Sequence, residues 1–198
     1  MLTLPVISSL ILAYVLGSIP TAVWIGKAFY DIDVREYGSG NAGATNTFRV
    51  LGKKAGIPVL LIDAFKGFAA VSLVHLFTEE PISTEAFVNY QLGLGIAAVI
   101  GHIFPLFAGF RGGKGIATLL GLMLGIHPEG ALLALVVFLL VFALTRFVSL
   151  GSMSAAISFP FLIVLVFQAT VPSLIIFSMF VAILVLVTHQ KNIERLVR

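Results

Sequence analysis

The chain contains no cysteine and few charged residues. Of its 198 residues, only 11% are Asp, Glu, Lys or Arg. A soluble domain carries about 25%. The lack of cysteine excludes a disulfide framework, a thiolate nucleophile and a cysteine-ligated metal site. Because 59% of the residues are hydrophobic, the composition favours an integral membrane protein. We read the net charge of +3 as loop charge, not as a nucleic-acid-binding signal.

Long apolar runs predict the fold. Runs of about 17–25 residues, long enough for a helix to cross a bilayer, recur along the whole chain. The predicted spans cover residues 3–27, 55–77, 86–107, 114–127, 130–146, 150–168 and 171–189. We therefore expect an all-α integral membrane protein, a bundle of about seven transmembrane helices that forms one polytopic domain over residues 1–198. Because the fourth run is short, five spans with two re-entrant segments is an alternative.

The distribution of charge predicts the orientation in the membrane. With seven spans, one side receives eleven of the twelve basic residues. They are Lys27, Arg35, Arg49, Lys53, Lys54, Arg111, Lys114, Arg146, Lys191, Arg195 and Arg198. The other side receives no lysine or arginine, and it carries four acidic residues: Glu79, Glu80, Glu85 and Glu129. The positive-inside rule makes the basic side cytoplasmic, so the N-terminus is expected outside and the C-terminus inside.

The first polar cluster is YGSGNAGATNTFR, residues 37–49. Its glycines match the spacing of a dinucleotide fingerprint, but no strand precedes them and no βαβ unit surrounds them. Closely spaced glycines followed by a helix can still direct backbone N–H groups at an anion. We expect a short helix over 45–51, ended by Gly52, with Thr45, Asn46 and Arg49 on one face. A flexible interfacial loop is the alternative.

The second cluster, FRGGKGIAT (residues 110–118), places glycines and a lysine at the start of a predicted span. It is not a Walker A motif, because Gly115 stands where Ser or Thr is required. It does combine a helix N-terminus with Lys114, which suits a phosphate. Ordinary flanking charge is the alternative reading for Arg111 and Lys114.

The C-terminal segment HQKNIERL supplies a third cluster. If the last helix continues past the membrane, His189 and Asn192 lie on one face, and His189 is a candidate phosphate ligand or general base. Upstream, TRFVSLGSM offers hydroxyls at Ser149 and Ser152. Neither serine has the surroundings of a nucleophile.

Two charges fall inside the second predicted span. Asp63 and Lys66 are three residues apart, and charges within a membrane are functional candidates by default. An ion pair within the helix, which orients the span beneath the first cluster, is the equal alternative.

The three clusters together resemble the motifs of a known family. GSGNAGATNTFR, GHIFPLFAGFRGGKGIAT and H-x-x-N-I-x-R-L are similar to the three motifs of the bacterial acyl-phosphate:glycerol-3-phosphate acyltransferases, the PlsY family. The resemblance covers the whole chain in length, span order and motif order. It implies a multi-pass enzyme of the bacterial cytoplasmic (inner) membrane with a cytoplasmic active site. The implied reaction transfers a fatty acyl group from acyl phosphate to the 1-hydroxyl of glycerol 3-phosphate, giving lysophosphatidic acid and phosphate.

The resemblance also implies roles for individual residues. Expected to bind acyl phosphate are Ser39, Gly40, Asn41, Gly43, Thr45, Asn46, Gly112 and Gly113. Expected to bind glycerol 3-phosphate are Arg49, Lys114, Ser152, His189 and Asn192, although Ser149 is an alternative to Ser152. The catalytic group is expected to be Arg49, Lys114, His189 and Asn192.

The chemistry needs no cofactor, no metal and no obligatory protein partner, only the two phosphate substrates and the bilayer. An acyl phosphate is already activated, so no covalent acyl-enzyme is expected, and His189 and the donor phosphate both remain candidate bases. A small anion or phosphate transporter is the alternative function. It would be expected to show an internal repeat and several midplane charges, and the sequence shows neither.

Overall fold

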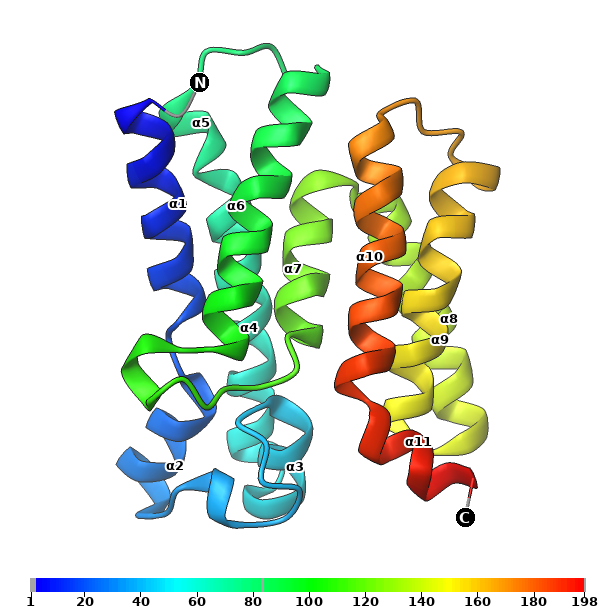
Figure 1. Cartoon of the computed structure of the whole chain (residues 1–198). Coiled ribbons are helices and arrows are strands. Elements are labelled where there is room, and N and C mark those ends of the chain that lie inside the picture. Colours follow the sequence, from blue (N-terminus) through cyan, green and yellow to red (C-terminus); the bar gives the residue numbers. More distant parts are fainter. Residues whose placement is uncertain (1–2, 83, 198) are drawn as a thin grey trace. The chain divides into compact units, whose positions relative to one another are not determined.

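The structure, a computed structural model, describes residues 3–82 and 84–197, and in that part of the chain every regular element is a helix. The helices form two compact units, one ending at Ile126 and the other beginning at His127 (Figure 1). The N-terminal unit contains α1 (Leu4–Gly17), α2 (Thr21–Tyr30), η1 (Val34–Glu36), α3 (Ala44–Leu51), α4 (Lys53–Ser72), α5 (Val74–Phe77), α6 (Glu85–Ile103), η2 (Leu106–Ala108) and α7 (Ile116–Ile126). The C-terminal unit contains α8 (Pro128–Thr145), α9 (Val148–Phe161), the π-helix η3 (Leu162–Val166), α10 (Pro172–Thr188) and α11 (Gln190–Val197).

Five helical segments of the described residues are long and apolar enough to cross a membrane. They are Leu4–Tyr30, Lys53–Phe77, Glu85–Ala108, Pro128–Thr145 and Val148–Val166. Two shorter apolar helices, Ile116–Ile126 and Pro172–Thr188, correspond to the fourth and seventh predicted spans. All seven predicted apolar segments are thus helical. The number that cross the bilayer, and the predicted orientation, stay predictions.

Large apolar side chains cover the outside of these helices. Leu144 is 85% exposed and Leu61 is 62% exposed, both on membrane-length helices. In water such a surface would promote association, whereas lipid tails accommodate it.

The first predicted span is broken in the structure. α1 ends at Gly17 and α2 begins at Thr21, so residues 18–20 interrupt the helix. Pro20 lacks the N–H that a continuing helix needs, and it disfavours helical geometry at Ile19 before it. The apolar run therefore forms two helices, and the second extends to Tyr30.

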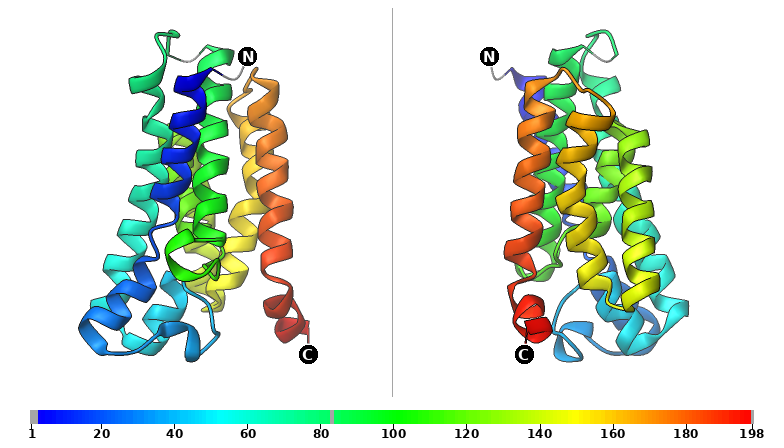
Figure 2. Two further views of the ribbon diagram at one scale, coloured as in Figure 1. Left: turned by 60° about the vertical axis from the view of Figure 1, so that its left-hand side comes forward. Right: turned by 90° about the vertical axis from the view of Figure 1, so that its right-hand side faces the viewer.

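Glycines allow the helices of the N-terminal unit to pack closely. A methyl group on Gly121 of α7 would overlap the carbonyl oxygen of Ala64 in α4, and one on Gly67 of α4 would overlap that of Thr118 in α7. Backbones in direct contact through small residues are typical of helix packing in membranes. α1 and α6 also pack side by side (Figure 2).

The C-terminal unit is a helical hairpin extended by a third helix. α8 packs against α9, and α9 packs against α10 (Figure 2). Pro128 and Pro172 begin α8 and α10, where the missing N–H of proline leaves no helical hydrogen bond unmade.

Candidate active site

The first glycine loop, residues 37–43, folds around the side chain of Asn46. The Oδ1 atom of Asn46 accepts hydrogen bonds from Ser39 N at 2.8 Å and Ser39 Oγ at 3.1 Å. Its Nδ2 atom donates to the carbonyls of Val34 at 2.8 Å and Tyr37 at 3.1 Å. Because these four bonds use the amide fully, Asn46 shapes the loop from beneath.

The short helix predicted after this loop is confirmed. α3 runs over Ala44–Leu51 and ends at Gly52, which has a φ of 80°. Its N-cap residue is Gly43, which provides no side-chain cap, so the helix N-terminus suits an anion. Thr45 and Arg49 are exposed, whereas Asn46 is buried, so the three residues predicted to share a face have different surroundings.

The second glycine loop connects α6 to α7. α7 begins at Ile116, immediately after the Gly-Gly-Lys-Gly run, as predicted. Gly112 N donates to Ile103 O at 3.1 Å and Gly113 N donates to His102 O at 3.2 Å. These bonds satisfy carbonyls at the end of α6, which lack partners within the helix. The amides of Gly112 and Gly113 are thus directed at α6, and their expected contact with acyl phosphate stays a prediction.

Both glycines are required by the close approach of this loop to α6. A methyl group on Gly112 would overlap the His102 carbonyl oxygen, and one on Gly113 would overlap His102 Nε2. The His102 ring is buried directly beneath the loop. Sequence reasoning did not single out His102, because its role depends on a contact with a residue eleven positions later.

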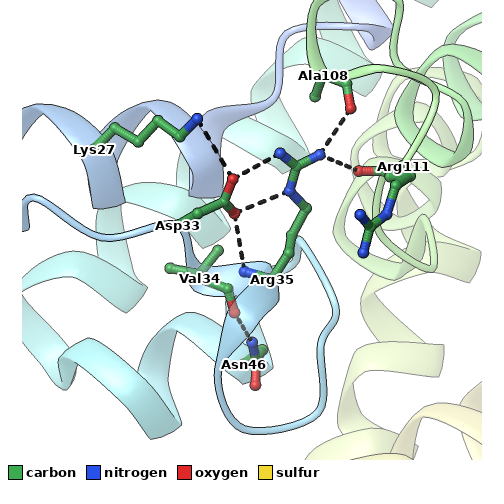
Figure 3. Close-up of polar contacts among 7 residues, drawn as sticks. All are labelled: Lys27, Asp33, Val34, Arg35, Asn46, Ala108 and Arg111. Atoms are coloured by element: carbon green, nitrogen blue, oxygen red, sulfur yellow. Dashed lines mark hydrogen bonds and ion pairs between the residues drawn. The ribbon is translucent and has the colours of Figure 1, made fainter.

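The two glycine loops meet at the same end of the N-terminal unit. Ala42 N donates to Gly112 O at 3.5 Å. The guanidinium of Arg35 also bridges them, since it is hydrogen-bonded to the carbonyls of Ala108 and Arg111 (Figure 3). Arg35 was read from the sequence only as loop charge, so this bridge was missed.

Arg35 is held by Asp33, and the pairing fixes the charge of both groups. The hydrogen bond from the Arg35 guanidinium holds the pKa of the Asp33 carboxyl far below its ordinary value, against the opposing effect of burial. The same hydrogen bond raises the pKa of Arg35. Both side chains are therefore ionised at any physiological pH.

Asp63 and Lys66 form an ion pair within α4, which was one of the two readings of their spacing. Lys66 Nζ lies 2.9 Å from Asp63 Oδ1, and both side chains are buried. The carboxylate also accepts a hydrogen bond from Thr21 Oγ1 at 3.1 Å and lies 3.8 Å from His102 Nδ1. The pair thus links α4 to the start of α2, and it lies close to His102 of α6.

The predicted residues of the third cluster lie in the C-terminal unit. α10 ends at Thr188 and α11 begins at Gln190, so the last helix is interrupted at His189 and does not continue unbroken. His189 is buried, its Nδ1 lies 2.8 Å from Val185 O, and its carbonyl accepts from Asn192 N at 2.8 Å. The side chain of Arg195, in the same motif, lies outside the described residues, as does Arg198.

The two candidate serines both belong to α9. Ser152 is buried, and its hydroxyl donates to Val148 O at 2.9 Å, whereas Ser149 is half-buried. Within residues 3–82 and 84–197, no group of three or more His, Asp or Glu side chains could hold a metal ion.

Comparison with known sequences identifies the family. The family described as "Glycerol-3-phosphate acyltransferase" matches residues 7–198. The chain is 43% identical to the glycerol-3-phosphate acyltransferase of Chlorobaculum tepidum, over 94% of this chain and 91% of the relative. It is 44% identical to that of Chlorobium chlorochromatii, over 99% of this chain and 94% of the relative.

Solved structures agree with this assignment. The chain resembles the crystal structure of PlsY (YgiH), an integral membrane glycerol 3-phosphate acyltransferase, in its glycerol 3-phosphate form, with a TM-score of 0.84 and 39% identity, over 97% of this chain and 92% of that one. It also resembles the lysophosphatidic acid form, with a TM-score of 0.81 and 38% identity, over 97% of this chain and 91% of that one. The chain therefore belongs to the PlsY family of integral membrane glycerol-3-phosphate acyltransferases.

Proposed function

We propose that this chain transfers a fatty acyl group from acyl phosphate to the 1-hydroxyl of glycerol 3-phosphate, and releases lysophosphatidic acid and inorganic phosphate. The observation that supports it most is the meeting of two glycine-rich loops at Ala42 and Gly112, beside a helix N-terminus and Lys114. A phosphate-bearing donor suits such a site. The relatives' shared name and the ligand forms of the solved structures support glycerol 3-phosphate as the acceptor.

The proposed donor site is built on the two loops. Its proposed residues are Ser39, Gly40, Asn41, Gly43, Thr45, Asn46, Gly112 and Gly113. The buried Asn46 is proposed to act by shaping the first loop, because its amide is already bonded to Ser39, Val34 and Tyr37.

The proposed acceptor site uses cations and polar side chains of the other motifs. Its residues are Arg49, Lys114, Ser152, His189 and Asn192. Arg49 and Lys114 would balance the charge of the glycerol 3-phosphate group. We propose that the whole chain acts as one acyltransferase domain. Substitutions in the motifs of either unit should then stop the same reaction.

The proposed mechanism is direct transfer. The acceptor hydroxyl attacks the acyl carbonyl, the new ester C–O bond forms, and the bond between the carbonyl carbon and the phosphate oxygen breaks. Phosphate leaves with the electron pair, and the hydroxyl proton passes to it or to His189. Positioning of the two substrates, and cations beside the leaving phosphate, carry the rate acceleration. No acyl-enzyme is needed.

Donor use is tested with purified protein in detergent. Acyl phosphate, acyl-CoA and acyl carrier protein are offered separately with glycerol 3-phosphate, and lysophosphatidate and phosphate are measured. We expect product only with acyl phosphate. Rapid quenching with labelled acyl phosphate, without acceptor, should leave no acylated protein. Turnover with acyl-CoA alone, or a chemically competent acyl-protein, would contradict the proposal.

The role of Lys114 is tested by Lys114→Ala. Loss of a cation that stabilises charge in the transition state should lower turnover by about 10²–10³, with the protein still monodisperse. Lys53→Ala is the matched control, because Lys53 is an exposed lysine at the start of α4 in the same unit. Equal activity of the two variants would remove Lys114 from the site.

A further inference from the structure

Arg35 occupies a central position between the two glycine loops. It lies in η1, directly before the first loop, and its side chain is only 15% exposed. Its Nη1 atom donates to Ala108 O at 2.7 Å and to Arg111 O at 3.3 Å (Figure 3). One nitrogen therefore binds two carbonyls of the second loop.

The other side of the guanidinium is fixed by Asp33. Arg35 Nε donates to Asp33 Oδ1 at 2.9 Å and Nη2 donates to Oδ2 at 2.7 Å, which is the bidentate arrangement. Asp33 Oδ1 also accepts from the backbone N of Arg35 at 3.0 Å, so the carboxylate itself is tied to η1. The guanidinium of Arg35 is thus held in an orientation that points towards the second loop.

The two carbonyls that Arg35 binds flank a tight turn. Between Ala108 and Arg111, both Gly109 and Phe110 have positive φ values, of 61° and 58°. A left-handed phenylalanine is costly unless other interactions hold it. Arg35 bonds both ends of this turn, and the chain reaches Lys114 three residues later.

We propose that Arg35, oriented by Asp33, is a positioning residue that sets the separation of the two glycine loops and thereby forms the binding site for the phosphate of the acyl donor. This inference rests on the proposed function. Arg35 touches loop carbonyls, so it acts on the substrate through Gly112, Gly113 and Lys114. No sequence motif for phosphate binding predicts such a residue.

Lysine cannot reproduce these contacts. An ammonium is a single point on a flexible stem, whereas the guanidinium engages both Asp33 oxygens and two carbonyls through fixed, divergent N–H groups. Arg35→Lys therefore keeps the charge and loses the geometry. It separates positioning from a general electrostatic effect of a cation near the site.

The experiment compares Arg35→Lys with Lys27→Ala. Lys27 Nζ lies 3.5 Å from the same Asp33 carboxylate, but its side chain is 60% exposed. We expect Arg35→Lys to raise the KM for acyl phosphate by about 10- to 100-fold, as for loss of charge-assisted hydrogen bonds. The KM for glycerol 3-phosphate should change less than about 2-fold, and Lys27→Ala should resemble the parent in both.

Asp33→Asn provides a second variant. It retains the size of the side chain but removes the charge that orients the Arg35 guanidinium. It should therefore raise the KM for acyl phosphate, as Arg35→Lys does. The KM of the double variant for acyl phosphate should be no higher than that of Arg35→Lys alone, because both changes disturb the same pair of side chains. Additive effects would overturn the proposal.

Hydrogen exchange gives a readout that does not depend on turnover. Faster exchange of the Phe110–Gly113 amides is expected in Arg35→Lys, while the amides of α1 exchange as in the parent. Equal rises in both Michaelis constants, or exchange that does not differ from the parent, would overturn the positioning role. If the parent uses a donor other than acyl phosphate, the proposed function fails, and the KM for that donor together with the exchange data still decides the role of Arg35.

Discussion

The buried ammonium of Lys66 donates a hydrogen bond to the backbone carbonyl of Ile19 at 2.8 Å. That carbonyl belongs to the break between α1 and α2, which Pro20 imposes. The same ammonium lies 2.9 Å from Asp63 Oδ1, which in turn accepts from Thr21 Oγ1. One ion pair on α4 therefore supplies partners to the break and to the first residue of α2.

Replacing Lys66 should destabilise the protein strongly. Lys66→Met leaves the Asp63 carboxylate buried without a countercharge and the Ile19 carbonyl without its donor. Breaking a buried pair by removing one partner costs about 3–5 kcal/mol. We expect a clear fall in melting temperature in detergent, while Lys53→Met, an exposed change on the same helix, leaves it unchanged.

A double variant tests whether the loss comes from the unpaired charge. Asp63→Asn combined with Lys66→Met removes both charges, so it should be more stable than Lys66→Met alone. If the double variant loses the sum of the two single effects, the ion pair is not the cause.

Close packing of α4 against α7 gives a second prediction. Gly121→Ala forces a methyl group against the Ala64 carbonyl, and overpacking typically costs about 1–3 kcal/mol. Gly93→Ala is the control, because its methyl group would lie 3.7 Å from Leu10 Cδ2, an ordinary contact. Melting temperatures should fall for Gly121→Ala and hold or rise for Gly93→Ala. The reverse order would contradict the observed helix approach.

The sequence predicted the elements that depend on local chemistry. Long apolar runs predicted the helices, Gly52 predicted the end of α3, and the Gly-Gly-Lys-Gly run predicted the start of α7. Each of these depends on residues a few positions apart. The break at Pro20 was missed. Most residues on both sides of it are apolar, so the run was predicted to form one continuous span despite the proline.

Contacts between distant segments could not be read from the sequence. The sequence predicted that Asn46 lies on the short helix α3. Only the structure shows that its amide faces inwards, where it donates hydrogen bonds to the carbonyls of Val34 and Tyr37. Arg35 was one basic residue among many until the second loop supplied carbonyls to its guanidinium. The hydrogen-bond partners of such side chains depend on which distant segments meet in the folded protein, and composition and spacing do not show this.

The Asp33–Arg35 pair gives a pH-dependent prediction for stability. The pKa of Asp33 is lowered in the folded protein by the hydrogen bond from Arg35. Its stabilising contribution is therefore fully present above the unfolded pKa of about 4 and is lost as pH falls through the lower folded value. Asp33→Asn should melt below the parent at neutral pH, and the difference should shrink below about pH 4.

Asp31→Asn is the control for this pH series. Asp31 is exposed and stands two positions away, at the C-cap of α2, with a left-handed backbone that asparagine tolerates. Its melting temperature should follow the parent at every pH. A gap between Asp33→Asn and the parent that stays constant down to pH 2 would contradict the assignment.

Orientation in the membrane is tested with single cysteines, since the chain has none of its own. Arg111→Cys, Lys191→Cys and Glu80→Cys all replace exposed side chains. We expect a membrane-impermeant thiol reagent added to intact cells to label only the cysteine at position 80. Gly113 is unsuitable, because a side chain there would overlap His102. Labelling of positions 80 and 111 from the same side would refute both the span count and the cytoplasmic site.

The geometry of His189 separates its two possible roles. Its Nδ1 atom lies 2.8 Å from Val185 O, and a carbonyl can only accept, so Nδ1 carries the proton of the neutral ring. Nε2 is then the nitrogen that could take a proton from the acceptor hydroxyl or accept a hydrogen bond from it. Asparagine can keep a donor near the Nδ1 position, and glutamine can place a polar atom near the Nε2 position, but neither amide is a base.

If the donor phosphate accepts the proton, His189 serves mainly to bind glycerol 3-phosphate. This is the outcome we expect, because a phosphate oxygen with a second pKa of about 6 is comparably basic and already lies beside the carbonyl under attack. His189→Gln should then retain more affinity for glycerol 3-phosphate than His189→Asn, since only glutamine reaches the Nε2 position, and the KM should change more than kcat. If His189 is the base, both variants should instead lose kcat alike, by about 10²–10⁴, with the KM for glycerol 3-phosphate unchanged and the acidic limb of the pH profile abolished. Steady-state kinetics of the two variants across pH, at saturating acyl phosphate, distinguish these outcomes.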